Sequence, residues 1–353
     1  MKLPVPVRRA VRQMRPYQPP LEGRTTKLRL DFNENTVGCS PAVRRALARL
    51  SRDQVAMYPE YEVARQRLAR FFRVRSAELV LTNGTDDALR LLVDTFVDPR
   101  TSVLVVEPNF AMYRFYAELA GARIKALRYD AAMRFPLEKV QQALAQRPRL
   151  FFLANPNNPT GTLVEPDVLQ QLLFTASGTL LVVDEAYWEF SNVTVLPWIR
   201  RYPNLAVTRT FSKASGLAGL RLGCLFANRT LVAALHKAHS PYSVNTAALV
   251  AAQAALQDVR FVGHYTQEVT HARSELLENL SRLKITWFPT KGNFVLVDFG
   301  PRAPRLLAAF RRKGILLRDR SSDFGRVGYV RITVGTRAHT RRLIKALEQL
   351  WPS

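Results

Sequence analysis

Apolar and polar residues follow two different spacings along the chain. Short apolar runs, several of them rich in valine, begin at Val103, Leu150, Leu180 and Leu205. Between such runs lie longer segments, for example 86–96 and 165–176, in which apolar residues recur every three or four positions. Continuous apolar runs are typical of strands buried on both faces of a parallel sheet, and the longer spacing is that of amphipathic helices. The pattern predicts an α/β fold in which a mostly parallel sheet is flanked by helices.

The pattern changes after about residue 242. An alanine-rich helical stretch is followed by two strand-like runs, 293–299 and 327–335, and a helical segment, 304–314, separates them. The first 28 residues are rich in proline and poorly periodic, which indicates an extended arm. We expect the first residues of the large domain to pack with the small one. The predicted parts are an N-terminal arm at 1–28, a large domain at 29–242 and a smaller α+β domain at 243–353.

The chain carries a formal net charge of +24, with 52 lysines and arginines among 353 residues. These residues are spread along the whole sequence, without a dense basic tail or an aromatic RNA-binding motif. We interpret the charge as an arginine-rich surface, with attraction of anionic substrates as the second interpretation. Nucleic-acid binding is not expected.

Cysteine and histidine positions give no sign of a disulfide framework or a metal site. Cys39 and Cys224 fit no CxxC spacing, and His236 and His239 have helical spacing without an HExxH motif. The N-terminal segment lacks the apolar stretch of a signal peptide, and no run of about 18 apolar residues follows that could cross a bilayer. We therefore expect a cytoplasmic protein without a membrane partner.

Polar residues at one strand end suggest a phosphate-bearing aldehyde cofactor. In open α/β sheets, ligands bind beyond the carboxyl ends of the strands. The run from Leu205 ends in Thr210, Ser212 and Lys213, with Arg221 further on. Two hydroxyls and a guanidinium suit a phosphate dianion, and cationic neighbours lower the pKa of a lysine, which an amine needs to attack an aldehyde. A lone lysine at a strand end would be an ordinary surface residue, but these surroundings favour a chemical role.

Other strand ends add residues that suit the same cofactor. Asp184 could keep a pyridine nitrogen protonated, and no second acid, histidine or GxGxxG segment supports a metal or dinucleotide site. Asn158, in NPNNPTG, either donates to a phenolate oxygen or belongs to a tight turn. The backbone N–H groups of Gly84 and Thr85 point at an anion, as in many strand-to-helix turns. Phe110 either covers a planar ring or is a core aromatic.

Nine segments, in this order and spacing, carry a resemblance to a known family. They are NENT, YPEYE, NGTDDAL, NPNNPTG, DEAY, TFSKASGLAGLRLG, SPYSVNT, GILLRD and RITVGT. Together they resemble the fold-type I aminotransferases that use pyridoxal phosphate (PLP), and more closely the histidinol-phosphate aminotransferases. The resemblance covers nearly the whole chain.

The resemblance implies a role for each matching cofactor residue. Lys213 is the lysine that carries PLP, Asp184 is the partner of the ring nitrogen, and Tyr187 joins Asn158 in holding the phenolic oxygen. Lys213, Asp184 and Tyr187 are thus the implied catalytic residues. Tyr58 matches a tyrosine that reaches the cofactor of the neighbouring subunit, which implies a homodimer with shared active sites. The implied ring and phosphate contacts are Phe110, Gly84, Thr85, Thr210, Ser212 and Arg221.

The resemblance also implies a substrate site and a reaction. Arg331 matches the arginine that binds the substrate carboxylate, and Tyr17, Tyr242 and Arg318 fall where the family contacts a substrate phosphate. Asn33 is assigned to the same site. Singly, those three phosphate contacts could be an arm residue, a helix-cap tyrosine and a surface arginine. The implied reaction moves an amino group between histidinol phosphate, a phosphorylated amino alcohol, and 2-oxoglutarate, which becomes glutamate.

Two departures from the family pattern and three alternatives remain. Thr36 stands where a proline is common, and Phe110 stands where many bacterial relatives have tyrosine. The alternatives are an aminotransferase for aromatic or other amino acids, a threonine-phosphate decarboxylase, and a binding module that has lost catalysis. Dependence on the substrate phosphate separates the first alternative from the implied reaction.

Overall fold

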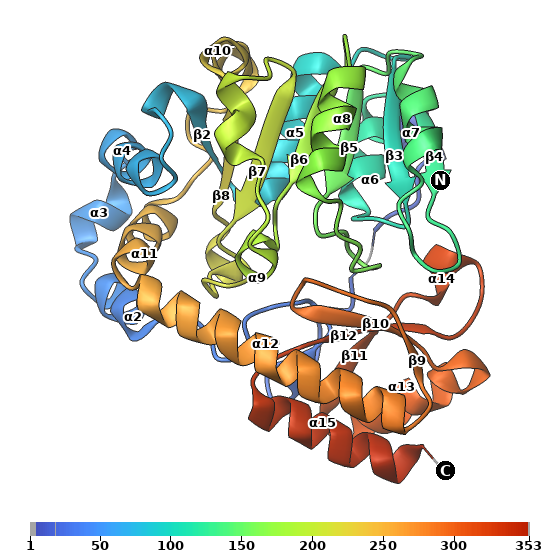
Figure 1. Cartoon of the computed structure of the whole chain (residues 1–353). Coiled ribbons are helices and arrows are strands. Elements are labelled where there is room, and N and C mark those ends of the chain that lie inside the picture. The colour runs from blue at the N-terminus through green and yellow to red at the C-terminus, as the bar shows by residue number, and fades with distance from the viewer. Residues whose placement is uncertain (1–4, 18, 352–353) are drawn as a thin grey trace.

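Two β-sheets with helices packed against them form the protein (Figure 1), whose computed structural model describes residues 5–17 and 19–351. The larger sheet consists of β2 (Leu79–Thr82), β3 (Ser102–Glu107), β4 (Arg123–Arg128), β5 (Leu150–Ala154), β6 (Leu180–Asp184), β7 (Leu205–Thr210) and β8 (Gly223–Ala227). Within the described residues its order is β2-β8-β7-β6-β5-β3-β4, and only β8 runs antiparallel to its neighbours. The predicted mostly parallel α/β sheet is confirmed.

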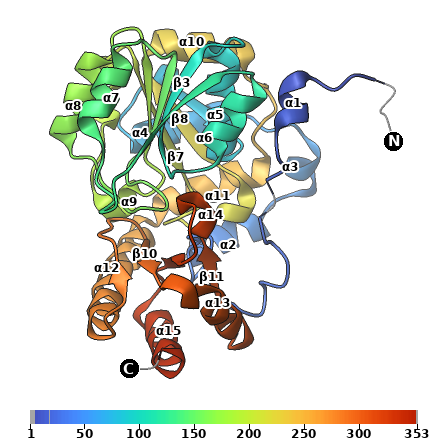
Figure 2. The ribbon, with the colours of Figure 1, turned by 90° about the vertical axis from the view of Figure 1, so that its right-hand side faces the viewer.

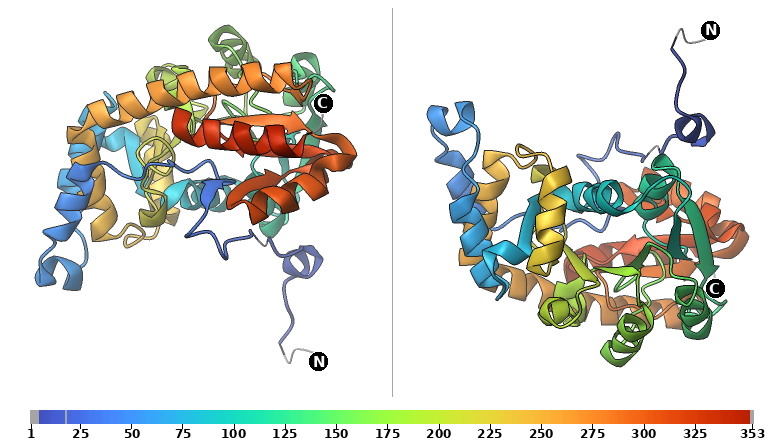
Figure 3. Two further views of the ribbon diagram at one scale, coloured as in Figure 1. Left: turned by 90° about the horizontal axis from the view of Figure 1, so that it is seen from below. Right: turned by 90° about the horizontal axis from the view of Figure 1, so that it is seen from above.

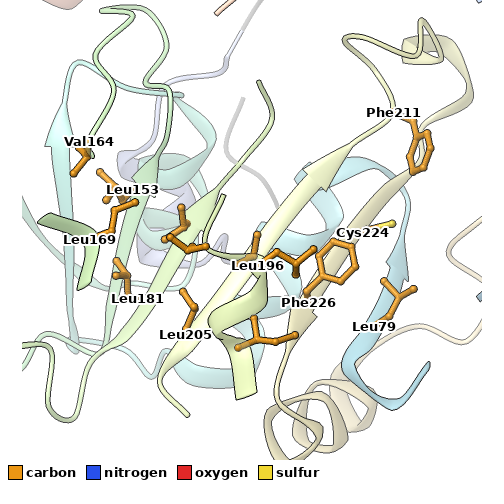
Figure 4. Close-up of a cluster of buried hydrophobic side chains, with 14 of the residues drawn as sticks. Leu79, Leu153, Val164, Leu169, Leu181, Leu196, Leu205, Phe211, Cys224 and Phe226 are labelled. Carbon is orange, nitrogen blue, oxygen red and sulfur yellow. The ribbon is translucent and has the colours of Figure 1, made fainter. Parts of the chain in front are cut away.

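The central strands β5, β6 and β7 are buried on both faces because helices cover both, whereas the edge strand β4 has no buried residue. Phe151 and Leu153 of β5 point into one hydrophobic cluster and Phe152 into the other, as the alternation of a strand requires. Figure 4 shows part of the first cluster, where Leu181 and Leu205 pack near Leu153. That face is covered by α4 (Glu62–Phe71), α7 (Leu137–Leu144) and α8 (Pro166–Thr175), and the other by α5 (Gly84–Phe96), α6 (Met112–Leu119) and α10 (Arg229–Ala238).

The second sheet is smaller and mostly antiparallel. Its strands are β1 (Leu28–Leu30), β9 (Thr286–Trp287), β10 (Phe294–Asp298), β11 (Ile315–Asp319) and β12 (Tyr329–Thr333), in the order β1-β11-β12-β10-β9. The view from below in Figure 3 shows two long helices side by side under it. The helices of this part are α12 (Val259–Arg282), α13 (Ala303–Arg312), α14 (Ser321–Phe324) and α15 (Arg337–Leu350). Strand β11 was not predicted from the apolar pattern.

The alanine-rich helix α11 (Thr246–Gln257) packs with the larger sheet. Ala248 and Ala252 are buried in the same cluster as Phe151, whereas Tyr265 of α12 belongs to the cluster of the second sheet. Small side chains let α11 lie close to α2 (Pro41–Ala48). We therefore propose a domain boundary near residue 258, between α11 and α12, in place of the expected boundary at residue 242. The sequence pattern changes at 242 because the alanine-rich segment begins there, but this segment still packs with the larger sheet.

The N-terminal arm leads from the outside of the molecule to the space between the sheets. Its helix α1 (Arg9–Gln13) projects beside α6 (Figure 2), where Arg8 Nη2 donates to the Leu119 carbonyl at 2.9 Å. Further on, Arg24 pairs with Asp31 and Glu34. Residues 1–4 and 18 of the predicted arm lie outside the described residues. The two remaining short helices are α3 (Arg52–Ala56) and α9 (Trp188–Ser191).

No helix in the described part of the chain combines the length and the apolar character needed to cross a membrane.

Candidate active site

A cavity of about 360 Å³ lies between the two sheets, at the carboxyl ends of β5, β6 and β7. This is the edge at which an α/β sheet binds ligands. Residues from the arm and from β11 and β12 close its other side. The predicted residues that line it are Tyr17, Thr85, Phe110, Asn158, Asp184, Tyr187, Thr210, Ser212, Lys213, Arg221, Arg318 and Arg331.

Asp184 is buried at the end of β6 and is held by two donors. Its Oδ2 accepts a hydrogen bond of 2.7 Å from the Tyr113 hydroxyl, and its Oδ1 accepts one of 3.2 Å from the Ala186 N–H. Burial raises the pKa of Asp184, and the hydrogen bond from Tyr113 lowers it. The carboxylate is therefore fixed in orientation inside the cavity.

Tyr113 is a site residue that the sequence analysis missed. It is fully buried, stacks on Phe152 with ring centroids 5.2 Å apart, and meets the edge of Phe110. The sequence could have pointed to Tyr113 through its position. It stands one helical turn after Phe110, and both residues follow the carboxyl end of a predicted strand. Tyr113 thus supports both the carboxylate and the aromatic side chain expected on the cofactor ring.

Lys213 places its amine in the same cavity as this carboxylate. Its Nζ donates to the Phe32 carbonyl at 3.0 Å. Burial, and then the nearby charge of Arg331, lower the pKa of Lys213 to about 8. A substantial fraction of this amine is therefore neutral at mildly alkaline pH.

A cradle for an anion lies where α5 begins. A Cβ on Gly84 would lie 2.5 Å from Arg221 Nη2, and one on Gly223 would lie 2.6 Å from the Gly84 carbonyl carbon. Two glycines therefore let the guanidinium and strand β8 approach the start of the helix. Arg221 Nη2 also donates to Asp86 Oδ2 at 2.9 Å. Together with the hydroxyls of Thr210 and Ser212, this donor set fits the phosphate of PLP.

Hydrogen bonds orient the two groups expected near the phenolic oxygen. Arg331 Nη1 donates to Asn158 Oδ1 at 2.6 Å, which leaves the amide nitrogen of Asn158 available as a donor. Asn33 Nδ2 donates to the Tyr187 hydroxyl oxygen at 2.9 Å. Asn33 is fully buried and does not line the cavity, so the structure places it behind Tyr187 and not in the expected substrate position.

Arginines from the second sheet form a cationic wall. Arg318 and Arg331 are direct neighbours across β11 and β12, and Arg320 lines the cavity beside them. Burial lowers the pKa of Arg331 to about 10, so it remains charged at neutral pH. The sequence analysis missed Arg320, which stands two positions after Arg318 in the same segment. This wall is suited to bind carboxylates or a phosphate.

Tyr58 and Tyr242 do not enter the cavity of their own chain. They are 75% and 63% exposed, and their ring centroids lie 4.6 Å apart on the surface. A single chain therefore does not bring these two predicted residues to the site. Tyr17, in contrast, does reach the cavity from the arm.

Comparison with known proteins identifies the class. Residues 25–347 match the family model of aminotransferase class I and II, and the chain belongs to this family. Within the class, it belongs with the histidinol-phosphate aminotransferases. It is 39% identical to the enzyme of that name from Symbiobacterium thermophilum, over 97% of this chain and 98% of the relative, and 33% identical to the one from Geobacillus sp. strain WCH70, over 98% of each.

A solved structure supports the cofactor as well as the fold. The histidinol-phosphate aminotransferase of Sinorhizobium meliloti, in complex with pyridoxal-5'-phosphate, is 25% identical with a TM-score of 0.88, covering 97% of this chain and 96% of that one. PLP is the cofactor of this protein, and the glycine-lined cradle, the buried carboxylate and the buried amine fit its phosphate, ring nitrogen and aldehyde.

The buried amine of Lys213 sets the pH at which the cofactor is captured. An amine attacks an aldehyde only in its neutral form, and the neutral fraction rises with pH until the pKa of about 8 is passed. We expect PLP capture by cofactor-free protein to accelerate about tenfold per pH unit below that pKa and to level off above it. The visible absorbance after mixing measures the rate. Lys213→Ala should give no such band, and a rate still rising at pH 10 would contradict the assignment.

The hydroxyl of Tyr113 stabilises the orientation and charge of Asp184. Tyr113→Phe keeps the ring packing but removes the 2.7 Å hydrogen bond to the carboxylate. Because such bonds to charged groups contribute about 1.5–3 kcal/mol, we expect the affinity for PLP to fall at least about tenfold. Equilibrium titration of cofactor-free protein measures it. Tyr129→Phe, at a buried tyrosine outside the cavity, is the matched control; an equal loss in both variants would show a general packing effect.

Proposed function

We propose that this protein transfers an amino group between histidinol phosphate and 2-oxoglutarate. The observation that carries the proposal is the position of two arginines. Arg318 and Arg331 stand opposite each other on neighbouring strands and line the cavity that also contains Lys213. The names of its relatives support the same substrate.

The chain's own residues supply proton transfer and orientation. When bound, PLP supplies an aldehyde that captures the substrate amine and an electron-poor ring that accepts the electrons of the broken C–H bond. Asp184 keeps the ring nitrogen protonated, because a buried carboxylate favours a positive charge beside it. Lys213, once its amine is free, would accept the proton from the substrate carbon at Nζ and deliver it to the carbon of the cofactor that carried the aldehyde. Tyr187 and Asn158 orient the phenolic oxygen.

One cationic wall serves both substrates in turn. A phosphate and a carboxylate are each bound by guanidinium groups through paired hydrogen bonds. We assign the phosphate of histidinol phosphate to Arg318, with Arg320 beside it, and a carboxylate of 2-oxoglutarate or glutamate to Arg331. Tyr17 lies at the open side of the cavity, where it would cover the bound phosphate.

Two other activities remain as alternatives for the same site. An aminotransferase for aromatic or other amino acids would use Arg331 without needing Arg318. A threonine-phosphate decarboxylase would use both arginines but would release carbon dioxide. The 39% identity to a histidinol-phosphate aminotransferase favours amino transfer with histidinol phosphate over both alternatives.

We further propose a homodimer with shared active sites in a cytoplasmic setting. Val55, Met57, Tyr58 and Val63 are all more than half exposed on the surface formed by α3 and α4. An exposed cluster of this kind is suited to bury itself against a second copy. In such a dimer Tyr58, and Tyr242 beside it, would contribute to the partner's cavity.

Absorbance of the PLP-loaded protein tests the substrate assignment. We expect histidinol phosphate, and separately glutamate, to convert the visible cofactor band to that of the aminated form. Histidinol without the phosphate should act at least about tenfold more weakly, since a charged hydrogen-bonded contact is lost. A band that responds to glutamate but not to histidinol phosphate would reject the substrate and keep the aminotransferase. Carbon dioxide from O-phosphothreonine would favour the decarboxylase.

Arg318→Gln refines that experiment. We expect this variant to lose the preference for histidinol phosphate over histidinol while it keeps its activity on histidinol. Arg312→Gln, at an exposed arginine of α13, is the matched control and should behave as the wild type. A preference that survives Arg318→Gln would assign the phosphate to other residues.

Mixing two impaired variants tests the shared site. We expect Lys213→Ala and Tyr58→Ala to be weakly active alone. After exchange of subunits, a mixed dimer would contain one site with both Lys213 and Tyr58, so activity should recover to roughly a quarter of the wild type at most. Absence of recovery in a mixture that sedimentation shows to contain dimers would contradict the sharing of Tyr58.

A further inference from the structure

A second cavity, of about 230 Å³, lies behind the loop that carries Lys213. Thr210 lines both this cavity and the active-site cavity, and Ser215 of the same loop lines the second one. Its other walls come from the end of α4, from α9 and from the junction of α11 and α12, where Figure 1 shows α9 above the long helix. The cavity is therefore separate from the substrate site but shares a wall with it.

Four aromatic side chains, Phe71, Phe72, Trp188 and Phe211, line the cavity. Phe72 and Phe211 pack edge to face with ring centroids 6.3 Å apart, and Trp188 lies 6.5 Å from Phe72. Phe71 is 40% exposed and lies near the opening. Such a lining favours an aromatic or heteroaromatic ring as the ligand.

One carboxyl group in this cavity lacks a partner in the described part of the chain. Arg209 is already paired, because its Nε and Nη2 donate to Glu185 Oε2 at 2.9 and 2.8 Å. Glu189 also lines the cavity, and its buried Oε2 has no hydrogen-bond partner among the described residues. Arg209 is committed to Glu185, so Glu189 has no cation of its own within residues 5–17 and 19–351. Burial raises the pKa of Glu189 to about 8, so this carboxyl group is largely protonated at neutral pH and would ionise when a cation binds beside it.

A glycine inside a long helix keeps the opening of the cavity free. Gly263 lies in α12, which extends over 24 residues, and no atom of the described residues lies within 4 Å of a Cβ built there. Glycine destabilises the interior of a helix. The space beside Gly263 is open, so a larger side chain at this position would fill it without a clash.

We propose that this cavity binds a small aromatic or heteroaromatic molecule with one positive charge, which pairs with Glu189. The aromatic walls hold the ring, and the cation supplies the missing partner of the carboxylate. Because α11 belongs to the cluster of the larger sheet, α12 belongs to that of the second sheet and Thr210 lines both cavities, the bound molecule also contacts the parts that position Lys213.

Ligand-observed NMR titration of the PLP-loaded protein tests the proposal. The probe is N,N-dimethylbenzylamine, a tertiary amine that cannot condense with the cofactor aldehyde, and the matched neutral compound is benzyl methyl ether. We expect saturable binding of the amine at least tenfold tighter than that of the ether. Equal affinities, or no saturable binding of the amine, would overturn the proposal.

Two variants locate the bound probe. Glu189→Gln keeps the shape of the side chain and should weaken the amine at least tenfold without weakening the ether. Gly263→Leu should cover the opening and abolish binding of both compounds, while His264→Leu, at the next and exposed position, should leave them unchanged. Amine binding that survives both Glu189→Gln and Gly263→Leu would place the probe elsewhere and reject this site. Unchanged visible absorbance and activity show that each variant is folded.

Discussion

Burying a charged group is costly unless it finds a partner, and this constraint organises the space between the two sheets. Asp184 of the larger sheet is held by Tyr113 from α6, and Arg331 of the second sheet is held by Asn158 from the loop after β5. Lys213 is held by the carbonyl of Phe32, in the segment between the arm and α2. Each pair joins two different elements, so the chemistry of the site and the arrangement of the domains depend on the same contacts.

Much of the larger sheet and of the cofactor site could be predicted from the sequence. The runs that form β5 and β6 are almost entirely apolar and β7 begins with an apolar run, and in a parallel sheet their polar ends must meet at one edge. That rule alone brings Asn158, Asp184 and Lys213 together. The identity of the cofactor needed more, namely the order and spacing of segments shared with a family.

The parts that could not be predicted depend on contacts between distant segments. Tyr113 is an aromatic residue on a helix, which a core position explains equally well until its hydroxyl is seen on Asp184. Asn33 lies in a recognisable motif, but only tertiary packing puts it behind Tyr187. Strand β11 carries arginine where a core strand would carry an apolar residue, because its end lines the cavity. Function here overrides the pattern that marks a buried strand.

The pairing of β1 with β11 has a consequence for synthesis. Leu28 is in register with Ile315, near the opposite end of the 353-residue chain, while the strands of the larger sheet are complete by Ala227. Domains that finish early fold early as the chain leaves the ribosome. The segment from β1 to Asn33 must therefore wait, with its leucines uncovered, until most of the protein has been made. The N-terminal end is the first part to be translated and among the last to reach its place, and the active site is completed only at that moment.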